Sequence, residues 1–205
     1  MWAALKGREA LEIEWQESEH VKYDSQLYKE QLKKSCQEPA AVLRDKGDVK
    51  TALANAVKTH TASYYVPELI HAPMEAPAAA AYFHDGIVDI WASTQTPQSA
   101  QRNVAQFLGL EPEKVNVNVT LLGGGFGRKS KPDFIVEAAF LSKQLNLPVK
   151  VVWTREDEIQ NGYYHAVSYQ TLKAGFDDNN SVTAWHHTAV APTISATFSK
   201  GADLL

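Results

Sequence analysis

The residues of this 205-residue chain that are best suited to chemistry lie in LLGGGFGRKSKPDF (121–134), where three consecutive glycines precede Phe126 and Gly127. Glycine adopts positive φ angles and has no Cβ, so a glycine-rich backbone can come close to a bound group. Loops of this kind present backbone N–H groups to an anion, usually a phosphate or an oxo group. A tight turn between a strand and a helix is the alternative interpretation. One glycine would serve such a turn, so the run of three with an embedded Phe favours a binding site.

Residue spacing excludes the three common phosphate-binding loops. Counted from Gly123, the Walker A pattern requires a glycine where Arg128 stands, and so does the dinucleotide-binding pattern. The kinase-type loop requires a glycine at the position of Leu122. The glycine run therefore belongs to another kind of loop.

The patterns on either side place this loop at a strand-to-helix junction. The preceding VNVNVTLL (115–122) is apolar and β-branched, which is typical of a strand, and FIVEAAFLSKQL (134–145) has helical periodicity. Gln95 lies at a second junction, after a predicted strand over 87–94 and before a predicted helix over 96–108. Side chains at such junctions line ligand sites in mixed α/β architectures. Gln95 is therefore a second candidate binding residue.

The rest of the chain predicts interleaved helices and strands, and hence a mixed α/β (α+β) fold. Helices are predicted over 1–10, 26–34 and 49–60. Further strands are predicted over 11–15, 62–68, 78–84, 147–154, 163–174 and 181–190. Asp85-Gly86 is the strongest hairpin signal in the chain. Residues 69–77 are predicted as a proline-rich loop, and 155–161 as a charged loop or short helical turn.

The composition is that of a globular protein, with 44% hydrophobic and 21% charged residues. A net charge of −4 gives no electrostatic case for binding nucleic acid or an anionic membrane. No apolar run approaches the roughly 20 residues that span a bilayer. The single cysteine, Cys36, can form neither an internal disulfide nor a thiolate metal cluster. Cysteine usage thus leaves the compartment open.

Gln95 in STQTPQ (93–98), followed after a helix and a strand by GGGFGRK (123–129), resembles the large subunit of the molybdenum hydroxylases. This is the family of xanthine dehydrogenase and aldehyde oxidase. The match is closest to its bacterial isoquinoline 1-oxidoreductase and membrane-associated aldehyde dehydrogenase branch. Further matching stretches are HAPMEAPAAAAYFHDG (71–86), LGLEPEKVNV (108–117) and VKVVWTREDE (149–158). Several motifs in one collinear series make the resemblance specific.

The resemblance implies a molybdenum–molybdopterin cofactor and assigns contacts to it. In the family, the Gln of this segment hydrogen-bonds an oxo ligand of molybdenum, which implies that role for Gln95. The Phe-Gly pair of the loop brings backbone amides against the oxo face and the pterin, here Phe126 and Gly127. The other cofactor-binding residues that the resemblance implies are Gly124, Gly125 and Arg128. No side chain is expected to ligate the metal, because the pterin supplies its own sulfur ligands.

Two departures from the family bear on the reaction. Xanthine-oxidising members carry a substrate-orienting Glu just after the loop, where this chain has Ser130, so a purine substrate is not expected. The family's general base is a Glu expected beyond residue 205, so no catalytic residue is assigned. The resemblance implies a fragment of an oxidoreductase subunit that hydroxylates an aldehyde or N-heterocycle with oxygen from water and is inactive alone. The alternative is a non-enzymatic truncated subunit that acts only as a packing or interaction module.

The resemblance also carries expectations about organisation and partners. Residues 1–16 resemble the end of a preceding small α/β domain, 17–47 are predicted as a linker, and 48–205 as the N-terminal part of the molybdopterin-binding domain. Iron–sulfur clusters are expected on a small partner subunit, and a cytochrome c subunit and the cytosine dinucleotide form of the cofactor stay open. A small-molecule substrate is expected, without nucleic acid. A periplasmic or membrane-associated location is implied by the family alone.

Three weaker groups complete the candidates. The carboxylates at 156–158 are interpreted as a solvated turn or helix N-terminus. His186 and His187 are neighbours on a predicted strand and face opposite sides, so they are not expected to bind one metal. For the segment 71–75, with His71, Met74 and Glu75, both lining of the site and loop packing stay open.

Overall fold

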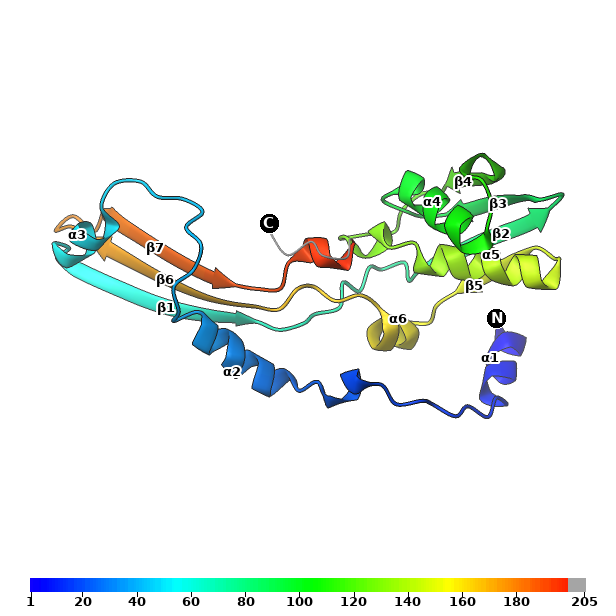
Figure 1. Ribbon diagram of the computed structural model, residues 1–205, viewed down its shortest axis with the longest axis horizontal. Coiled ribbons are helices and arrows are strands. Elements are labelled where there is room, and N and C mark those ends of the chain that lie inside the picture. Colours follow the sequence, from blue (N-terminus) through cyan, green and yellow to red (C-terminus); the bar gives the residue numbers. More distant parts are fainter. Residues whose placement is uncertain (199–205) are drawn as a thin grey trace. The chain divides into compact units, whose positions relative to one another are not determined.

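The computed structural model describes residues 1–198, and the chain divides into two compact units, each with its own sheet (Figure 1). Unit 1 comprises Met1–Tyr65 and Ser168–Ala191. Unit 2 comprises Val66–Val167 and the segment from Pro192 onward. None of the helices among the described residues is long and apolar enough to cross a membrane.

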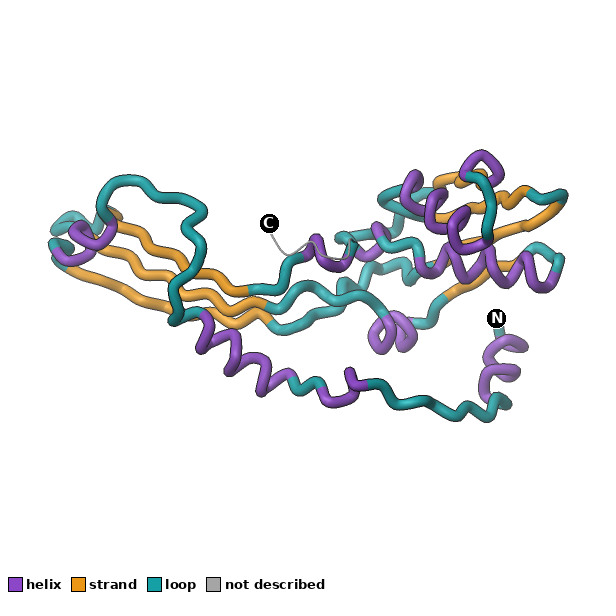
Figure 2. The backbone as a smooth tube through the Cα atoms, viewed as in Figure 1, coloured by secondary structure: helices purple, strands orange, loops and turns teal. Residues whose placement is uncertain are grey.

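Unit 1 is built around a three-stranded sheet in the order β1-β6-β7, whose strands are orange in Figure 2. Its helices and strands are α1 (Trp2–Glu9), α2 (Ser25–Ser35), α3 (Val49–Ala54), β1 (Lys58–Val66), β6 (Ser168–Phe176) and β7 (Val182–Val190). The antiparallel pair β6 and β7 is joined by a turn in which the Asp177 carboxylate accepts from the Asn179 N–H at 2.9 Å. Gly175 lets α3 and the residues after it approach this pair, since a Cβ there would lie 3.4 Å from Cδ2 of Leu53 and 2.9 Å from the Cβ of Ala56.

Unit 2 is built around a four-stranded sheet in the order β4-β3-β2-β5. Its helices and strands are β2 (Ala78–His84), β3 (Ile87–Ala92), α4 (Pro97–Leu108), β4 (Val115–Val119), α5 (Asp133–Leu145), β5 (Val149–Val152) and α6 (Arg155–Asn161). β2 pairs antiparallel with β3 and β5, whereas β3 and β4 are parallel and connected through α4. Parallel strands end at the same edge of a sheet. Ala92 therefore pairs with Val119, and the segments that follow β3 and β4 emerge side by side.

The hydrophobic core of unit 2 lies between this sheet and the helices α4 and α5. Alternate residues of β3 are buried, as the two-residue period of a strand requires, and α5 contributes the large side chains. The completely buried apolar residues of this core are Val88, Ile90, Ala100, Val104, Phe134, Ile135, Ala138 and Ala139. Burial of this apolar surface holds the two strand-to-helix junctions in place.

Most predicted elements are confirmed, together with the mixed α/β class. The hairpin turn has positive φ at Asp85 (48°) and Gly86 (74°), and α4 ends at Gly109 in the left-handed conformation. The charged segment at 155–161 is the short helix α6, which begins with a capping box formed by Thr154 and Asp157. Single-turn 3-10 helices lie at Glu19–Lys22, Pro112–Lys114, Arg128–Ser130 and Ile194–Thr197.

One strand and two element boundaries predicted from periodicity are wrong. Residues 11–15 are not a strand, because alternation alone does not supply a partner strand for their backbone groups. The helix predicted over 49–60 ends at Ala54, and Lys58 already begins β1, where a neighbouring strand outweighs helical periodicity. Likewise, the strand predicted from 163 begins only at Ser168, where pairing with β7 becomes available.

We predict that Ile90→Ala lowers the free energy of unfolding by about 3 kcal/mol, because Ile90 is 0% exposed and its loss leaves a cavity under α5. Urea denaturation followed by circular dichroism measures this change. The matched control is Ile159→Ala on α6, where the side chain is 47% exposed and the expected loss is below about 1 kcal/mol. Equal losses in the two variants would contradict the core described for unit 2.

Candidate functional site

The glycine loop, defined as residues 120–127, leads from β4 into the 3-10 helix Arg128–Ser130 and then into α5. Its backbone has positive φ at Gly124 (96°), Phe126 (52°) and Gly127 (95°). A positive φ is strained for phenylalanine. The Phe126 side chain is 66% exposed, so burial of its ring does not offset that strain. Contacts from neighbouring segments must hold the loop in this conformation.

Gln95 lies beside the glycine loop, as the shared edge of β3 and β4 requires. Its backbone N–H donates to the carbonyl of Lys129 at 3.0 Å, and its side-chain Oε1 accepts from the N–H of Gly127 at 3.0 Å. An N–H can face only an acceptor, so this contact fixes the amide oxygen towards Gly127 and directs Nε2 elsewhere. Within residues 1–198, Nε2 has no protein hydrogen-bond partner. The two N–H groups on Nε2 of Gln95 therefore have no acceptor among the described residues and can donate to a bound group.

Two glycines of the loop have no room for a side chain. A Cβ on Gly125 would lie 2.6 Å from Oε1 of Gln95, and a Cβ on Gly123 would lie 2.5 Å from the Cβ of Glu75. Non-bonded atoms do not approach so closely in packed proteins. The absence of Cβ atoms is therefore what allows Gln95 and Glu75 to contact the loop from two sides.

The glycine loop also carries backbone donors that the described protein does not use. Among residues 1–198, the N–H groups of Gly124, Gly125 and Phe126 donate to no protein acceptor. Gly125 is buried as a residue, and an unpaired backbone N–H in such a place is uncommon. Like the N–H groups on Nε2 of Gln95, these are neutral donors of the kind suited to an anionic or oxo group.

A charged network lies beneath the loop. Lys129 is 0% exposed, and its Nζ donates to the Glu75 carboxylate and, at 3.1 Å, to the Ser93 hydroxyl. The same carboxylate oxygen accepts from the Ser93 hydroxyl at 2.9 Å and from the Gly123 N–H at 3.0 Å. The N–H of Glu75 donates in turn to the Gly123 carbonyl at 3.0 Å. This network ties the glycine loop to β3 and to the segment 70–77.

The network shifts the ionisation of Glu75. Partial burial works to raise the pKa of its carboxyl, but hydrogen bonds from Lys129, Gly123 and Ser93 outweigh burial and hold the pKa below the ordinary value of 4.5. The carboxylate is therefore the stable form across the physiological range.

The Arg128 side chain points into the interior. It is 0% exposed, and two of its nitrogens donate to the Asp133 carboxylate at 2.9 and 2.8 Å. The guanidinium lies over the rings of Trp153 (5.1 Å) and Tyr163 (5.5 Å), an arrangement that stabilises a buried cation. Its Nε has no hydrogen-bond partner among the described residues. The structure thus brings Gln95, Gly125 and Gly127 together and places Arg128 as a support beneath them.

Sequence reasoning missed several residues that position the loop. Nothing in the periodicity marked Lys129 and Ser93 as buried, although a lysine directly after a glycine loop is a usable signal. Arg155 was also missed: its Nη2 donates to the carbonyls of Pro73 (2.6 Å) and Met74 (3.2 Å). These bonds attach the segment 70–77 to α6.

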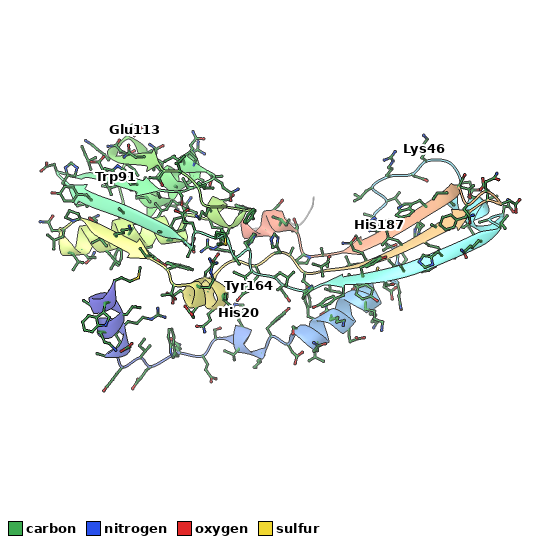
Figure 3. All side chains as sticks on the ribbon, turned by 180° about the vertical axis from the view of Figure 1, so that it is seen from behind. His20, Lys46, Trp91, Glu113, Tyr164 and His187 are labelled. Atoms are coloured by element: carbon green, nitrogen blue, oxygen red, sulfur yellow. The ribbon has the colours of Figure 1, made fainter. Side chains whose placement is uncertain are left out.

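The structure places the three weaker candidate groups in different surroundings. The acidic run at 156–158 lies in the first turn of α6, so its interpretation as a helix N-terminus is confirmed, but Glu158 is fully buried and pairs with Arg155 and is therefore not solvated. His187 lies on β7 (Figure 3), and its Nε2 lies 3.0 Å from Oε1 of Gln170. Of the segment 71–75, Met74 is 91% exposed, whereas His71 and Glu75 lie against the glycine loop. Among the described residues, no group of three His, Cys, Asp or Glu side chains could hold a metal ion.

The family model described as "Molybdopterin cofactor-binding domain" matches residues 32–199. The isoquinoline 1-oxidoreductase subunit beta of Brevundimonas diminuta is 35% identical over 122 residues, which are 58% of this chain and 16% of that protein. The membrane-bound aldehyde dehydrogenase [pyrroloquinoline-quinone] of Gluconacetobacter polyoxogenes is 30% identical over an alignment of 210 positions, which covers 98% of this chain and 27% of that protein.

A solved structure, the aldehyde oxidoreductase of Desulfovibrio gigas, has a similar fold, with a TM-score of 0.62 at 22% identity. The similarity covers 71% of this chain and 16% of that one. This chain therefore spans at most 27% of the length of these three proteins.

We predict that Glu75→Gln lowers the free energy of unfolding by about 2 kcal/mol at pH 7, because it leaves the buried ammonium of Lys129 without its counter-charge. The expected loss is below that of a fully buried pair, since the Glu75 side chain is 38% exposed and water reaches it. Urea denaturation measures it. Glu113→Gln, at an exposed glutamate, is the control and should change stability by less than about 0.5 kcal/mol.

We also predict that the difference in unfolding free energy between the wild type and Glu75→Gln depends on pH. Because folding lowers the pKa of Glu75, its stabilising contribution is complete above the unfolded value of 4.5 and is lost as the pH falls through the lower folded value. The difference in unfolding free energy between the wild type and Glu75→Gln should therefore shrink as the pH falls below 4.5. Denaturation curves between pH 7 and pH 3 test this, and a difference that does not change with pH would refute it.

Proposed function

We propose, because this chain belongs to the molybdopterin cofactor-binding domain family, that the glycine loop and Gln95 bind the molybdenum–molybdopterin cofactor. The resemblance predicted from the motifs is confirmed by the family match and by relatives named as isoquinoline 1-oxidoreductase, aldehyde dehydrogenase and xanthine dehydrogenase subunits. The family is one of molybdenum oxidoreductases. The contacts, the reaction and the partners below are our proposals.

The observation that carries this proposal is the set of unpaired donors at the loop. We call the N–H groups of Gly124, Gly125 and Phe126 and the amide of Gln95 the cradle; a Cβ on Gly125 would collide with that amide, 2.6 Å from Oε1 of Gln95. Such donors fit the oxo groups and carbonyl oxygen of the cofactor, which accept hydrogen bonds. The residues present therefore fit the group that the family binds. The Arg128 side chain is buried and paired with Asp133, so Arg128 would support the loop rather than touch the cofactor with its side chain.

When bound, the cofactor would supply the two-electron oxidation chemistry of the family. The residues of this chain would bind and orient it. Nε2 of Gln95 would donate to an oxo group, with its direction fixed by the Gly127 N–H on the other end of the amide. The loop N–H groups would present fixed dipoles that need no reorganisation during the reaction. The exposed ring of Phe126 would cover one side of the bound group and exclude water.

For the complete enzyme we propose hydroxylation of an aldehyde or an N-heterocycle. One C–H bond is replaced by C–OH with oxygen from water, and two protons and two electrons are released. The names of relatives support this reaction class: they include an indole-3-acetaldehyde oxidase from Arabidopsis thaliana and a nicotine 6-hydroxylase large subunit from Paenarthrobacter nicotinovorans. Ser130, at the place of the substrate-orienting Glu, argues against a purine. We expect no turnover by the 205-residue chain, because the general base is expected outside it.

The remaining proposals concern the surroundings of the enzyme. The electrons would pass to iron–sulfur clusters on a small partner subunit, with a cytochrome c subunit as a further acceptor. Names that describe relatives as subunits support an assembly of several chains. We propose a periplasmic or membrane-associated location, and one relative is named as membrane-bound. The cytosine dinucleotide is our proposed form of the cofactor.

We predict that Gln95→Ala weakens cofactor binding about tenfold, because it removes one hydrogen bond to an oxo group and releases the Gly127 N–H. Bound pterin and molybdenum are quantified after anaerobic incubation of the purified chain with cofactor released from a donor molybdoenzyme. Gln98→Ala, three residues later on the exposed side of α4, is the matched control and should bind as the wild type does. A wild-type chain that retains neither molybdenum nor pterin would contradict the proposed function.

Gly125→Ala should also weaken cofactor binding at least tenfold, because its Cβ would displace the Gln95 amide and occupy the cradle. The same incubation measures it. Gly7→Ala is the control, since a Cβ at that position meets no atom within 4 Å. Cofactor binding by Gly125→Ala at the wild-type level would show that the cradle is not the binding site.

A further inference from the structure

The segment 70–77 runs alongside the glycine loop and contacts it at three places. Glu75 pairs with Gly123 through two hydrogen bonds. A Cβ on Gly124 would lie 3.2 Å from the Cβ of Pro73, and a Cβ on Gly127 would lie 3.5 Å from Nε2 of His71. This segment thus lines the loop, and His71 is the member that meets Gly127.

The hydrogen bonding of His71 determines which ring nitrogen carries the proton. Its Nδ1 lies 3.1 Å from the backbone carbonyl oxygen of Tyr163. A carbonyl oxygen only accepts, so Nδ1 must be the protonated nitrogen. In the neutral ring, Nε2 then carries a lone pair, and Nε2 is the atom that faces Gly127.

The surroundings keep this ring neutral. Burial lowers the pKa of His71 below its ordinary value of 6.5, and the neighbouring His165 and Arg128 lower it further, against a smaller opposing effect of the Tyr163 carbonyl. The His165 ring lies 3.9 Å from the His71 ring, at 33° to it. Among the described residues, His165 and Arg128 are the groups whose charge acts on His71, and both disfavour an imidazolium.

The backbone around His71 is strained and held in place. Ala72 has a φ of 42°, which an L residue adopts at a cost and keeps only where its surroundings enforce it. Arg155 supplies that enforcement by donating to the carbonyls of Pro73 and Met74, and the N–H of His165 donates to the Leu69 carbonyl at 2.8 Å. Strain of this kind at a segment beside a candidate site is typical of residues positioned for function.

We propose that His71 is a further binding residue of this site, which accepts through Nε2 a hydrogen bond from an O–H or N–H of the bound group. This inference rests on the proposed function, since the bound group is the cofactor. It adds an acceptor to a site that otherwise offers donors. Gln95 and the loop N–H groups would bind the oxo side, and His71 would bind a part that carries a proton, such as a pterin N–H. Protonation of His71 removes the lone pair, so acid should weaken this contact.

The first test needs no cofactor. Long-range ¹H–¹⁵N spectra of the labelled chain report the tautomer and pKa of each histidine. We expect His71 to be neutral at pH 7, to carry its proton on Nδ1, and to titrate below 6.5. A proton on Nε2, or an imidazolium at pH 7, would overturn the assignment.

The second test compares pterin binding from pH 7.5 to pH 5 for the wild type, His71→Asn and His60→Asn. Asparagine keeps a donor near the position of Nδ1 and removes Nε2, and His60 is an exposed histidine of β1. Below the pKa of His71, wild-type affinity should fall about tenfold per pH unit, because one proton is linked to binding. His60→Asn should bind pterin as the wild type does at each pH. His71→Asn should bind it about tenfold more weakly at pH 7.5 and lack this pH dependence.

A wild-type pH dependence in His71→Asn would overturn the inference. Chemical denaturation of each variant at both pH extremes shows that all are folded where binding is compared. If no variant binds pterin at any pH, the proposed function fails, and the tautomer of the free chain still decides whether His71 carries the lone pair assigned to it.

Discussion

A buried ammonium group must be neutralised by a partner, and Lys129, two residues after the glycine loop, is completely buried. Its partner is Glu75, which comes from a segment more than fifty residues earlier in the chain. Because the same carboxylate oxygen also accepts from the Gly123 N–H, the ion pair and the loop backbone cannot move independently. The geometry of the whole site depends on this one carboxylate.

The strained features of the site follow from that constraint. With Gly123 held by Glu75 at one end and Gly127 held by Gln95 at the other, the residues between them have few conformations left, and Phe126 takes a positive φ. The N–H groups in between are then left without protein acceptors. Fixed donors of this kind are pre-organised for a ligand, since no loop rearrangement opposes binding. A flexible glycine loop would lose that advantage.

Much of the framework could be predicted from sequence because it depends on local signals. The hairpin at Asp85-Gly86, the start of α4 at Pro97 and its end at Gly109 each need only a residue with the right backbone preference. Gln95 was predicted as a candidate in the same way, by its place at a strand end, and its contact with Gly127 shows that it lies beside the loop. The failures share a different cause. Residues 11–15 alternate like a strand, but pairing requires a partner that alternation does not specify.

The burial of the charged residues that support the site could not be predicted from the sequence, for a related reason. Burial of Lys129 and Arg128 depends on contacts with Glu75, Asp133 and Trp153, which tertiary structure alone brings together. Charged side chains are rarely buried unless paired, so a lone sequence assigns them to the surface. The glycine loop could be recognised by its composition. The atomic positions were needed to show that Gln95 and Glu75 can contact the loop only because it has glycines there.

The measurement that tests the central claim most directly is a ¹H–¹⁵N spectrum of the labelled chain before and after addition of the molybdenum–molybdopterin cofactor. If the loop donors bind it, the largest shifts will fall on the backbone N–H signals of Gly124, Gly125 and Phe126 and on the side-chain amide of Gln95. Signals from unit 1, such as those of β6 and β7, will stay in place. Bound cofactor with unshifted loop signals would contradict the account.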